Sequence, residues 1–244
     1  MDKEQRVKMQ IGILRDLGYG INANTMILDL GCGNGDVVVA LRKIGYQAFG
    51  CDFVFKEGES ASDLEKNGFI KKILGAPYRL PFEDKTFDIL LSDQVLEHVR
   101  DYSRTFDEIG QILKPGGVSL HIFPSRYTPI EPHVYVPLAT VVQQLWWLKL
   151  WALFGIRTNK QQGMPAGEVA HKNYCYLREW TNYLTKKELI QALTPKFKQI
   201  KFCEDAFFKH SNRAKFLHYF SKVFRFLPGI YSTFRMRILL VVNR

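Results

Sequence analysis

Three glycines that follow a short apolar segment are the first residues whose spacing points to chemistry. The segment is Met26–Leu30, and it is followed by Gly31, Gly33 and Gly35. Glycines at this spacing let the backbone turn tightly and let a ligand lie directly against the chain. Asp52 lies 21 positions beyond Gly31, the distance at which a nucleotide-binding unit places an acid against ribose hydroxyls. We therefore expect a nucleotide-type ligand at this turn.

Two common kinds of nucleotide site do not fit the glycine turn. The dinucleotide fingerprint needs a third glycine at the position that Asp36 occupies, so a pyrophosphate would meet a negative charge there. A phosphate-binding loop of the Gly-Lys-Ser/Thr type is excluded because no such residues follow. The ligand is expected to be a nucleoside without a pyrophosphate.

A second group of residues has the types needed to move protons. The segment Pro124–His133 contains three prolines and carries Glu131 and His133. A histidine that titrates near neutral pH beside a carboxylate can act as an acid–base pair. We take His133 as the first candidate for a general base, although both residues could instead fix the loop. His98 follows as a candidate that could also cap a helix, and His171 ranks behind it.

Strands and helices must alternate along the chain to position these residues. Apolar segments predict strands at 26–30, 46–51, 69–74, 87–91, 118–123, 197–203 and 236–242. Amphipathic spacing predicts helices at 4–17, 36–44, 59–67, 103–113 and 186–193. This alternation favours a doubly wound, parallel α/β sheet. In such a sheet, ligands bind beyond the carboxyl ends of the strands.

Taken together, several motifs resemble one enzyme family. They are Ile-Leu-Asp-Leu-Gly-Cys-Gly-Asn-Gly at 27–35, the acid Asp52, Leu-Pro-Phe at 80–82, Phe-Asp at 87–88, Val-Leu-Glu-His-Val at 95–99 and Leu-Lys-Pro-Gly-Gly at 113–117. This combination is similar to the class I S-adenosylmethionine-dependent methyltransferases. The similarity is strong over residues 26–123 and looser over the last two strands. It implies a Rossmann-like sheet of seven strands whose last strand is antiparallel, with an α-helical cap inserted after strand five.

The resemblance also implies roles in holding S-adenosylmethionine. Asp29 would face the methionine amino group, Gly31 and Gly33 would line the methionine portion, and Asp52 would bind both ribose hydroxyls. Phe53 would lie against adenine, unless it is ordinary core packing. The remaining cofactor-binding positions that the resemblance implies are Cys32, Ala76, Pro77, Asp93 and Gln94. A helix N-terminus and glycine amides suit the methionine carboxylate.

One position departs from the family pattern. Members with a Leu-Pro-Phe turn often carry an acid four residues before the leucine, and here that position is Ala76. Pro77 follows it and has no N–H to offer the adenine ring. Adenine would then be held by stacking, by other backbone groups, or in a shifted register that uses Tyr78.

The alternation breaks between Pro124 and Thr185, where residues 124–184 form a long insertion. It includes an aromatic helix expected at 138–154, in which Gln143, Gln144 and Lys149 interrupt the apolar runs. These runs are shorter than the roughly 20 residues of a membrane span. We expect a cap with aromatic walls over the acceptor. Core packing and a membrane-surface location remain open.

The net charge of +10 is concentrated near the C-terminus. Residues 206–244 contain eight Lys or Arg and no acid, so the preceding residues carry only +2 (26 basic minus 24 acidic). The segment 207–235 mixes basic and aromatic residues before the last strand. It could touch anionic lipid, nucleic acid or an acidic acceptor, or it could be a solvated amphipathic helix. We expect nucleic acid least, because no RNA-binding module accompanies the segment.

The sequence thus predicts a single methyltransferase domain over residues 1–244. The expected activity is transfer of a methyl group to a small-molecule, saccharide or lipid-linked acceptor, with oxygen as the expected methylated atom. The alternatives are a quinone or lipid methyltransferase at the membrane surface and a cofactor-binding module without catalysis. Because the four cysteines show neither metal-ligand nor disulfide spacing, we expect reduced thiols and no metal. The charged N-terminus predicts a cytoplasmic protein without a secretory signal.

Overall fold

The alternating segments form one open sheet with helices on both sides. The structure, a computed structural model, describes residues 3–55, 59–75 and 78–244. In spatial order the strands of the main sheet are β3 (Ile70–Lys72), β2 (Gln47–Asp52), β1 (Met26–Leu30), β6 (Phe87–Asp93), β7 (Leu113–Pro124), β9 (Met236–Val242) and β8 (Gln199–Phe202). A separate hairpin pairs β4 (Leu74–Gly75) with β5 (Tyr78–Arg79).

The strand directions confirm the predicted fold class. Strands β3, β2, β1, β6 and β7 run parallel. Strand β9 runs antiparallel to both of its neighbours, β7 and β8. The sheet is therefore doubly wound, mostly parallel and seven-stranded, with an antiparallel last strand. The carboxyl ends of β1, β2, β6 and β7 meet at one edge, where Asp52, Asp93 and the residues after them lie.

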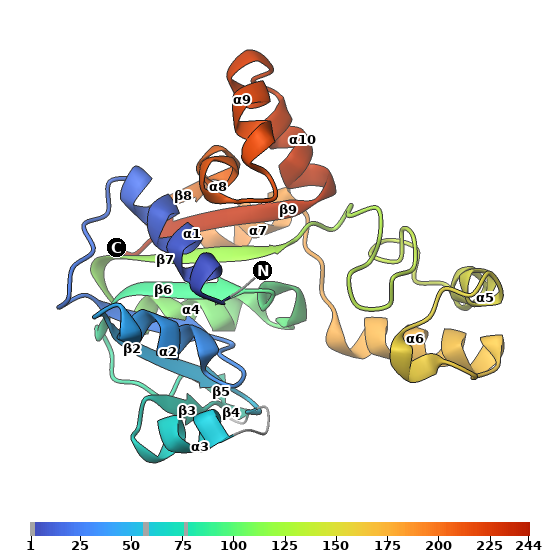
Figure 1. The fold of residues 1–244 in the computed structure, drawn as a ribbon, viewed down its shortest axis with the longest axis horizontal. Helices are drawn as coiled ribbons and strands as arrows, with labels where there is room; N and C mark the ends of the chain where they lie inside the picture. The colour runs from blue at the N-terminus through green and yellow to red at the C-terminus, as the bar shows by residue number, and fades with distance from the viewer. Residues whose placement is uncertain (1–2, 56–58, 76–77) are drawn as a thin grey trace.

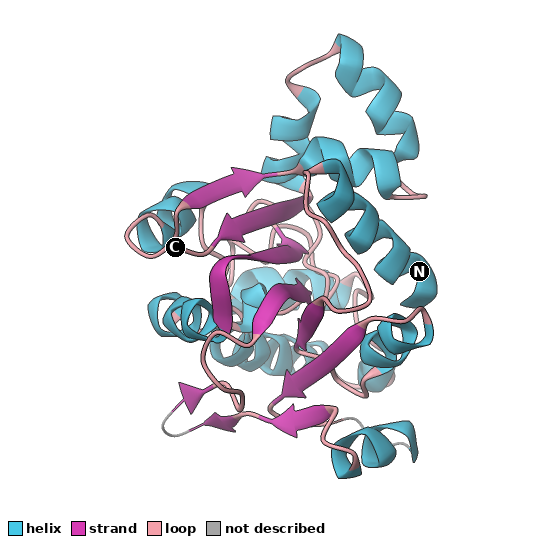
Figure 2. Ribbon diagram, turned by 90° about the vertical axis from the view of Figure 1, so that its left-hand side faces the viewer, coloured by secondary structure: helices cyan, strands magenta, loops and turns pink. Residues whose placement is uncertain are grey.

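Helices cover both faces of the sheet (Figures 1 and 2). One face is covered by α1 (Lys3–Asp16), α2 (Asp36–Lys43) and α8 (Glu204–His210), and α3 (Glu59–Lys66) adds Leu64 to the same apolar cluster. The other face is covered by α4 (Tyr102–Ile112) and α7 (Lys186–Leu193). Strand β1 shows why its sequence is apolar apart from Asp29: Ile27 packs into the first cluster and Leu28 into the second.

The insertion after β7 is more helical than the sequence predicts. The expected helix at 138–154 is present only as α5 (Leu145–Leu153). Leu138 has a left-handed φ of 55° and its amide donates to Pro129, so the chain is still turning there. A second long helix, α6 (Ala166–Trp180), was missed. Its buried Val169, Asn173 and Leu177 recur every four residues, which is the signal that could have revealed it.

The two cap helices pack against each other, beyond the end of β7 in Figure 1. They share a small apolar cluster of their own, which includes Val136, Leu148, Ala170 and Leu177. Part of the aromatic surface of α5 packs with this cluster, since Trp147 and Trp151 lie against it. The side chain of Trp146 is instead exposed.

The basic segment before β9 forms three helices rather than one. They are α8, α9 (Lys215–Val223) and α10 (Leu227–Phe234), and α9 and α10 project from the sheet edge beside β9 in Figure 1. Pro228, in the first turn of α10, marks the start of a new helix because proline is tolerated there and not in a helix interior. In the described part of the chain, no helix combines the length and the apolar character needed to cross a membrane.

Candidate active site

The turn after β1 has the backbone geometry that its glycines predict. Gly31, Gly33 and Gly35 have φ values of 78°, 58° and 80°, in the left-handed region that favours glycine. The Gly31 amide donates to the carbonyl of Cys51 at 2.8 Å, which ties the turn to β2. A Cβ on Gly31 would lie 2.3 Å from Cγ2 of Val95. The turn is thus held tightly between the ends of β2 and β6.

Asp52 lies at the carboxyl end of β2 and faces this turn. One carboxylate oxygen accepts from the Gly33 amide at 2.8 Å, and the other accepts from the Phe53 amide at 2.7 Å. Each oxygen keeps a lone pair that can accept from a further donor. The two hydroxyls of a ribose are donors of the kind that such a fixed carboxylate can bind.

Two aromatic rings stand beside Asp52. Phe53 is 53% exposed, so it is not core packing, and its ring lies 5.9 Å from that of Tyr78, centroid to centroid. The two rings give a flat base a surface to stack on. Ala76 and Pro77, which sequence analysis assigns to the adenine site, lie outside the described residues.

Asp29 is a buried carboxyl under the same turn. Burial, together with the nearby charge of Asp93, raises the pKa of Asp29 to about 8, although Arg6 opposes this shift. Arg6 comes from α1 and lies with Nε 3.2 Å from Oδ2 of Asp93. Without a ligand, Asp29 therefore holds a proton at neutral pH, and a positively charged ligand group beside it would favour its ionised form.

The other predicted cofactor residues occupy the same edge of the sheet. Asp93 ends β6, and Gln94 has a left-handed φ of 60°, with its amide donating to Ile122. The side chain of Cys32 is buried and faces β2, where a Cβ on Gly50 would lie 2.7 Å from its own. Burial raises the pKa of this thiol far above its usual range, so Cys32 is not a nucleophile.

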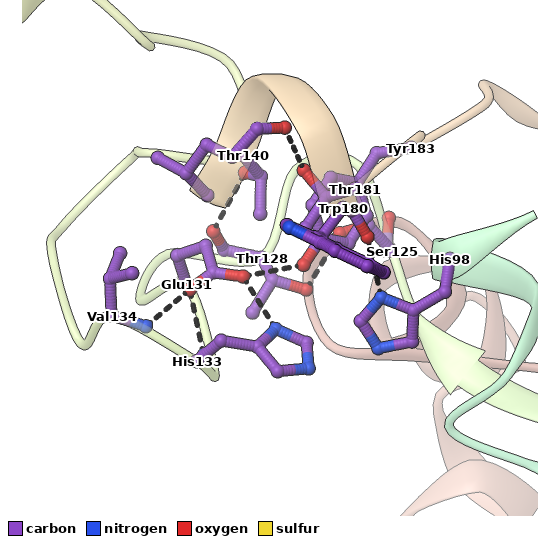
Figure 3. Close-up of polar contacts among 11 residues, drawn as sticks. His98, Ser125, Thr128, Glu131, His133, Val134, Thr140, Trp180, Thr181 and Tyr183 are labelled. Atoms are coloured by element: carbon purple, nitrogen blue, oxygen red, sulfur yellow. Dashed lines mark hydrogen bonds and ion pairs between the residues drawn. The ribbon is translucent and has the colours of Figure 1, made fainter. Parts of the chain in front are cut away.

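A second polar group is built around Glu131, in the segment after β7 (Figure 3). Its carboxylate accepts from the His133 ring at 2.8 Å and the Tyr183 hydroxyl at 2.6 Å. It also accepts from the amides of His133 and Val134, each at 2.7 Å. Burial alone would raise the pKa of Glu131, but these hydrogen bonds hold it below its usual value.

The ionised Glu131 fixes the state of His133. Because a carboxylate only accepts, Nδ1 of His133 carries a proton, and Nε2 is the ring nitrogen left for another partner. His98 is fixed in the same way, since its Nδ1 lies 2.6 Å from the carbonyl oxygen of Trp180. The two rings are 4.9 Å apart, centroid to centroid, and lie side by side in Figure 3. Burial lowers the pKa of His98, which favours its neutral form.

Glu97 is the functional candidate that sequence analysis missed. It belongs to the short 3-10 helix η1 (Leu96–His98) and is fully buried, and neither carboxylate oxygen has a hydrogen-bond partner among the described residues. Burial raises its pKa to about 8. One donor atom each from Glu97, His98 and His133 lie within 4.8 Å of one another. The adjacent acid and histidine at 97–98 were the available signal, but the lack of partners is visible only in the fold.

Contacts from the cap hold this group in place. Asn182, just after α6, donates its amide to the Glu97 carbonyl at 2.6 Å and its side-chain nitrogen to the Val99 carbonyl at 2.9 Å. Tyr176 on α6 places its ring 5.6 Å from that of His133. His171 is not part of this group. It is exposed on α6, with Nε2 3.7 Å from the sulfur of Cys175.

The two groups are joined by the short segment after β6. Val95 contacts the glycine turn, and Glu97 and His98 follow it by two and three residues. A ligand on the turn and a second molecule at the histidines would thus approach each other across this segment. At this end of the sheet, the glycine turn can bind a nucleoside. The histidines next to it can accept a proton or bind a cation.

Comparisons with known proteins agree with this geometry. Residues 28–120 match a family model described as a methyltransferase domain. Demethylmenaquinone methyltransferase of Staphylococcus aureus (strain JH9) is 31% identical over 139 residues, which cover 54% of this chain and 56% of that protein. The alignment thus spans only about half the length of the curated relatives that the chain matches.

Two solved structures share the fold. An S-adenosylmethionine-dependent methyltransferase from Mesorhizobium loti superposes with a TM-score of 0.55 at 14% identity, covering 98% of this chain and 100% of that one. Phosphoethanolamine N-methyltransferase 2 from Haemonchus contortus, in complex with S-adenosylmethionine, gives a TM-score of 0.52 at 15% identity, covering 96% and 51%.

Proposed function

We propose that this chain, a class I methyltransferase by its fold and by the methyltransferase domain at residues 28–120, transfers a methyl group from S-adenosylmethionine to a hydroxyl of a small molecule. The domain match and the fold support methyl transfer. The polar group around His133 supports a hydroxyl as the acceptor, because a hydroxyl must lose its proton and a thiolate or amine has less need of a base.

The donor supplies a methyl group on a positively charged sulfur. Asp52 takes the ribose hydroxyls, and the rings of Phe53 and Tyr78 hold adenine between the end of β2 and the hairpin. Asp29 faces the methionine amino group, and Gly31 and Gly33 lie along the methionine chain. Asp93, Gln94 and the backbone of Cys32 complete the cofactor side. The three positive φ values and the doubly anchored Asp52 fit this ligand.

The single observation that carries the acceptor proposal is the hydrogen bond between Glu131 and Nδ1 of His133. It turns Nε2 of His133 into the atom that meets the acceptor hydroxyl, in a group that also contains His98 and Glu97. Cap residues contact this group, which favours a small molecule or the accessible end of a saccharide or lipid-linked one as the acceptor.

The test separates binding from chemistry. Purified protein is first examined for thermal stabilisation by S-adenosylhomocysteine, with NAD as the comparison. It is then incubated with S-adenosylmethionine and a panel of phenols, quinols, sugars and lipid-linked hydroxyls, and release of S-adenosylhomocysteine is measured. Stabilisation and turnover with a hydroxyl acceptor are expected. Stabilisation by NAD alone would overturn the proposal, and stabilisation without any turnover would favour a binding module.

A second candidate function is methylation of a quinone or lipid at a membrane surface. It is favoured by the similarity to demethylmenaquinone methyltransferase and by the exposed aromatic residues of α9 and α10. These include Phe216, Tyr219, Phe220, Phe226 and Phe234. Preference for quinols presented in vesicles over water-soluble phenols would select this function.

A further inference from the structure

The buried carboxylate of Glu97 needs a partner that the described residues do not provide. Its side chain is fully buried and neither oxygen accepts a hydrogen bond among them. An unpaired polar group of this kind is costly, and buried carboxylates are normally paired, hydrogen-bonded or bound to a metal. The partner that Glu97 faces is therefore expected to be positively charged.

Two imidazoles converge on the same point with their lone pairs free to bind. Nδ1 of His98 is bonded to the Trp180 carbonyl, and Nδ1 of His133 is bonded to the Glu131 carboxylate. Each ring therefore offers its Nε2. A histidine whose second nitrogen donates to a carboxylate or a backbone carbonyl is the usual arrangement behind a metal ligand, because it fixes the tautomer and the ring orientation.

The spacing of the three side chains suits one ion. Their donor atoms lie within 4.8 Å of one another. Two ligands of one ion, each bonded at about 2.1 Å, are at most about 4.2 Å apart. Binding of one ion would therefore draw together, by rotation of the side chains, any donor atoms that lie farther apart than this.

We propose that Glu97, His98 and His133 bind one divalent transition-metal cation through a carboxylate oxygen and the two Nε2 atoms. Two imidazoles with one carboxylate suit Zn²⁺, Fe²⁺, Co²⁺ or Mn²⁺, whereas Mg²⁺ and Ca²⁺ prefer sites made of oxygen alone. Three protein ligands leave coordination positions open, as in catalytic metal sites. No cysteine takes part, so the cysteine spacing could not have indicated this site.

This inference rests on the proposed function and gives it a more specific mechanism. The cation, held by Glu97, His98 and His133, would lower the pKa of an acceptor hydroxyl beside it. The O–H bond breaks and the proton passes to solvent. The oxygen then bonds to the methyl carbon while the carbon–sulfur bond breaks and its electron pair stays on sulfur. In this state the lone pair of His133 holds the cation, and Glu131 positions His133 from behind.

The first experiment measures metal binding without donor or acceptor. Full-length protein is stripped with a chelator and dialysed, then titrated with Zn²⁺ by calorimetry and with Co²⁺ by visible absorption. One equivalent is expected to bind. Glu97→Gln and His133→Gln should each weaken binding at least tenfold, which is typical for the loss of one ligand or its support. His171→Ala is the matched control, because His171 and Cys175 form a close pair of possible ligands on the cap outside this group, and it should bind normally.

Folding of the variants is checked independently. Glu97→Gln keeps the size of the side chain and replaces a carboxyl whose oxygens accept no hydrogen bond among the described residues, so its thermal shift with S-adenosylhomocysteine should match that of the wild type. The metal site is overturned if no stoichiometric binding occurs, if Glu97→Gln and His133→Gln bind as tightly as the wild type, or if His171→Ala abolishes binding.

A second experiment distinguishes failure of the metal site from failure of the proposed function. The chelator-stripped protein is assayed with the acceptor identified above, before and after one equivalent of Zn²⁺, Co²⁺ or Mn²⁺ is restored. Turnover that falls at least tenfold and returns with metal supports the inference. Full turnover in protein free of metal overturns the inference and leaves the proposed function standing. Tight metal binding without methylation of any acceptor retains the site but overturns its role in hydroxyl activation.

Discussion

The hydrogen bonds of Glu131 determine what its neighbour His133 can do. Four donors hold the carboxylate, and one of them is Nδ1 of His133. Nε2 is thereby the ring nitrogen left for another partner, in an imidazole that lies beside His98 and Glu97, whether it accepts a proton or binds a cation. At the scale of single residues, the site consists of one carboxylate that positions a histidine, Glu131, and one that accepts no hydrogen bond from the residues that the structure describes, Glu97.

Replacing His133 should affect catalysis and leave cofactor binding intact. His133→Ala is expected to lower kcat by about 10²–10⁴-fold, the range for loss of a group that handles the proton of the acceptor. The Kd of S-adenosylhomocysteine, measured by calorimetry, should stay within about twofold of the wild type. Unchanged turnover at saturating acceptor would remove His133 from the mechanism.

The affinity for S-adenosylmethionine should depend on the ionisation of Asp29. Its pKa of about 8 means that the free protein binds a proton there at neutral pH. The methionine ammonium favours the carboxylate, so binding releases this proton below pH 8. Affinity should therefore rise with pH by up to about tenfold per unit as pH approaches 8, and then level off.

Calorimetry between pH 6 and 9, in buffers of different ionisation enthalpy, measures both the affinity and the released proton. Asp29→Asn provides the comparison, since it has no proton to lose, and its remaining pH dependence belongs to the ligand and other groups. If affinity and proton release depend on pH identically in the wild type and in Asp29→Asn, Asp29 does not face the amino group of the ligand.

Most residues that the structure gathers at this edge of the sheet are candidates that the sequence also predicts, with one instructive exception. Asp29, Asp52, His98, Glu131 and His133 stand out by type and position. Glu97 did not, because an acid beside a histidine is common and its meaning depends on the absence of donors around it. That absence is produced by packing between η1 and the cap, which no local pattern records.

At the scale of elements, the glycine turn is a rigid part of the site. It is tied to β2 by the Gly31 amide, and it leaves no room for a side chain against Val95. The motif was recognisable because its requirement is local, a positive φ at three positions. The cap illustrates the opposite case, since α6 and the late start of α5 depend on contacts between segments that are distant from the sheet.

Gly31→Ala should abolish cofactor binding, and Gly45→Ala is its matched control. Both glycines have positive φ values, 78° and 92°, so each alanine costs about 1–2 kcal/mol of backbone strain. A Cβ at Gly45 meets no atom within 4 Å, whereas one at Gly31 meets Val95 at 2.3 Å. Thermal unfolding without S-adenosylhomocysteine measures the loss of stability of each variant, and the shift on adding it measures cofactor binding. An equal thermal shift with S-adenosylhomocysteine in the two variants would show that the glycine turn can accommodate a side chain at position 31.

The cap should open separately from the sheet when its own cluster is weakened. Leu148 is fully buried between α5 and α6, so Leu148→Ala is expected to cost about 2–5 kcal/mol within the cap. Leu150→Ala, on the exposed side of the same helix, should have a much smaller effect. Hydrogen exchange should rise in residues 134–184 and stay unchanged in β1 and β6. Equal loss of protection in the sheet would mean that both parts unfold together.

At the scale of the whole molecule, charge and aromatic surface are concentrated in one projecting part. Residues 206–244 carry eight basic residues and no acid, and α9 and α10 expose aromatic rings among them. The charge asymmetry was visible in the sequence. The division of this segment into three helices was not, because it follows from packing of α8 against α1 while α9 and α10 extend outward.

If this surface meets lipid, binding should be salt-sensitive and local to the projecting helices. Flotation with vesicles that contain anionic lipid is expected to recover the protein at low salt and lose it at high salt. Lys222→Glu on α9 should weaken recovery, because each basic residue near an anionic membrane surface contributes about 1 kcal/mol to the free energy of membrane binding. Lys198→Glu, an equal charge change beside β8, should not. No flotation at any salt concentration would remove the membrane interpretation.

The position of β9 has a consequence for the order in which the molecule can fold. Its residues are the last of the sheet in sequence, yet β9 pairs with β7 on one side and β8 on the other. Until Met236–Val242 are in place, β8 has no strand to join among the described residues, and β7 has an open edge next to the segment that carries Glu131 and His133. These long-range pairings close late and slow the search for the native state. During synthesis, the part of the sheet around the glycine turn can therefore form first, while the edge beside Glu131 and His133 waits for the final strand.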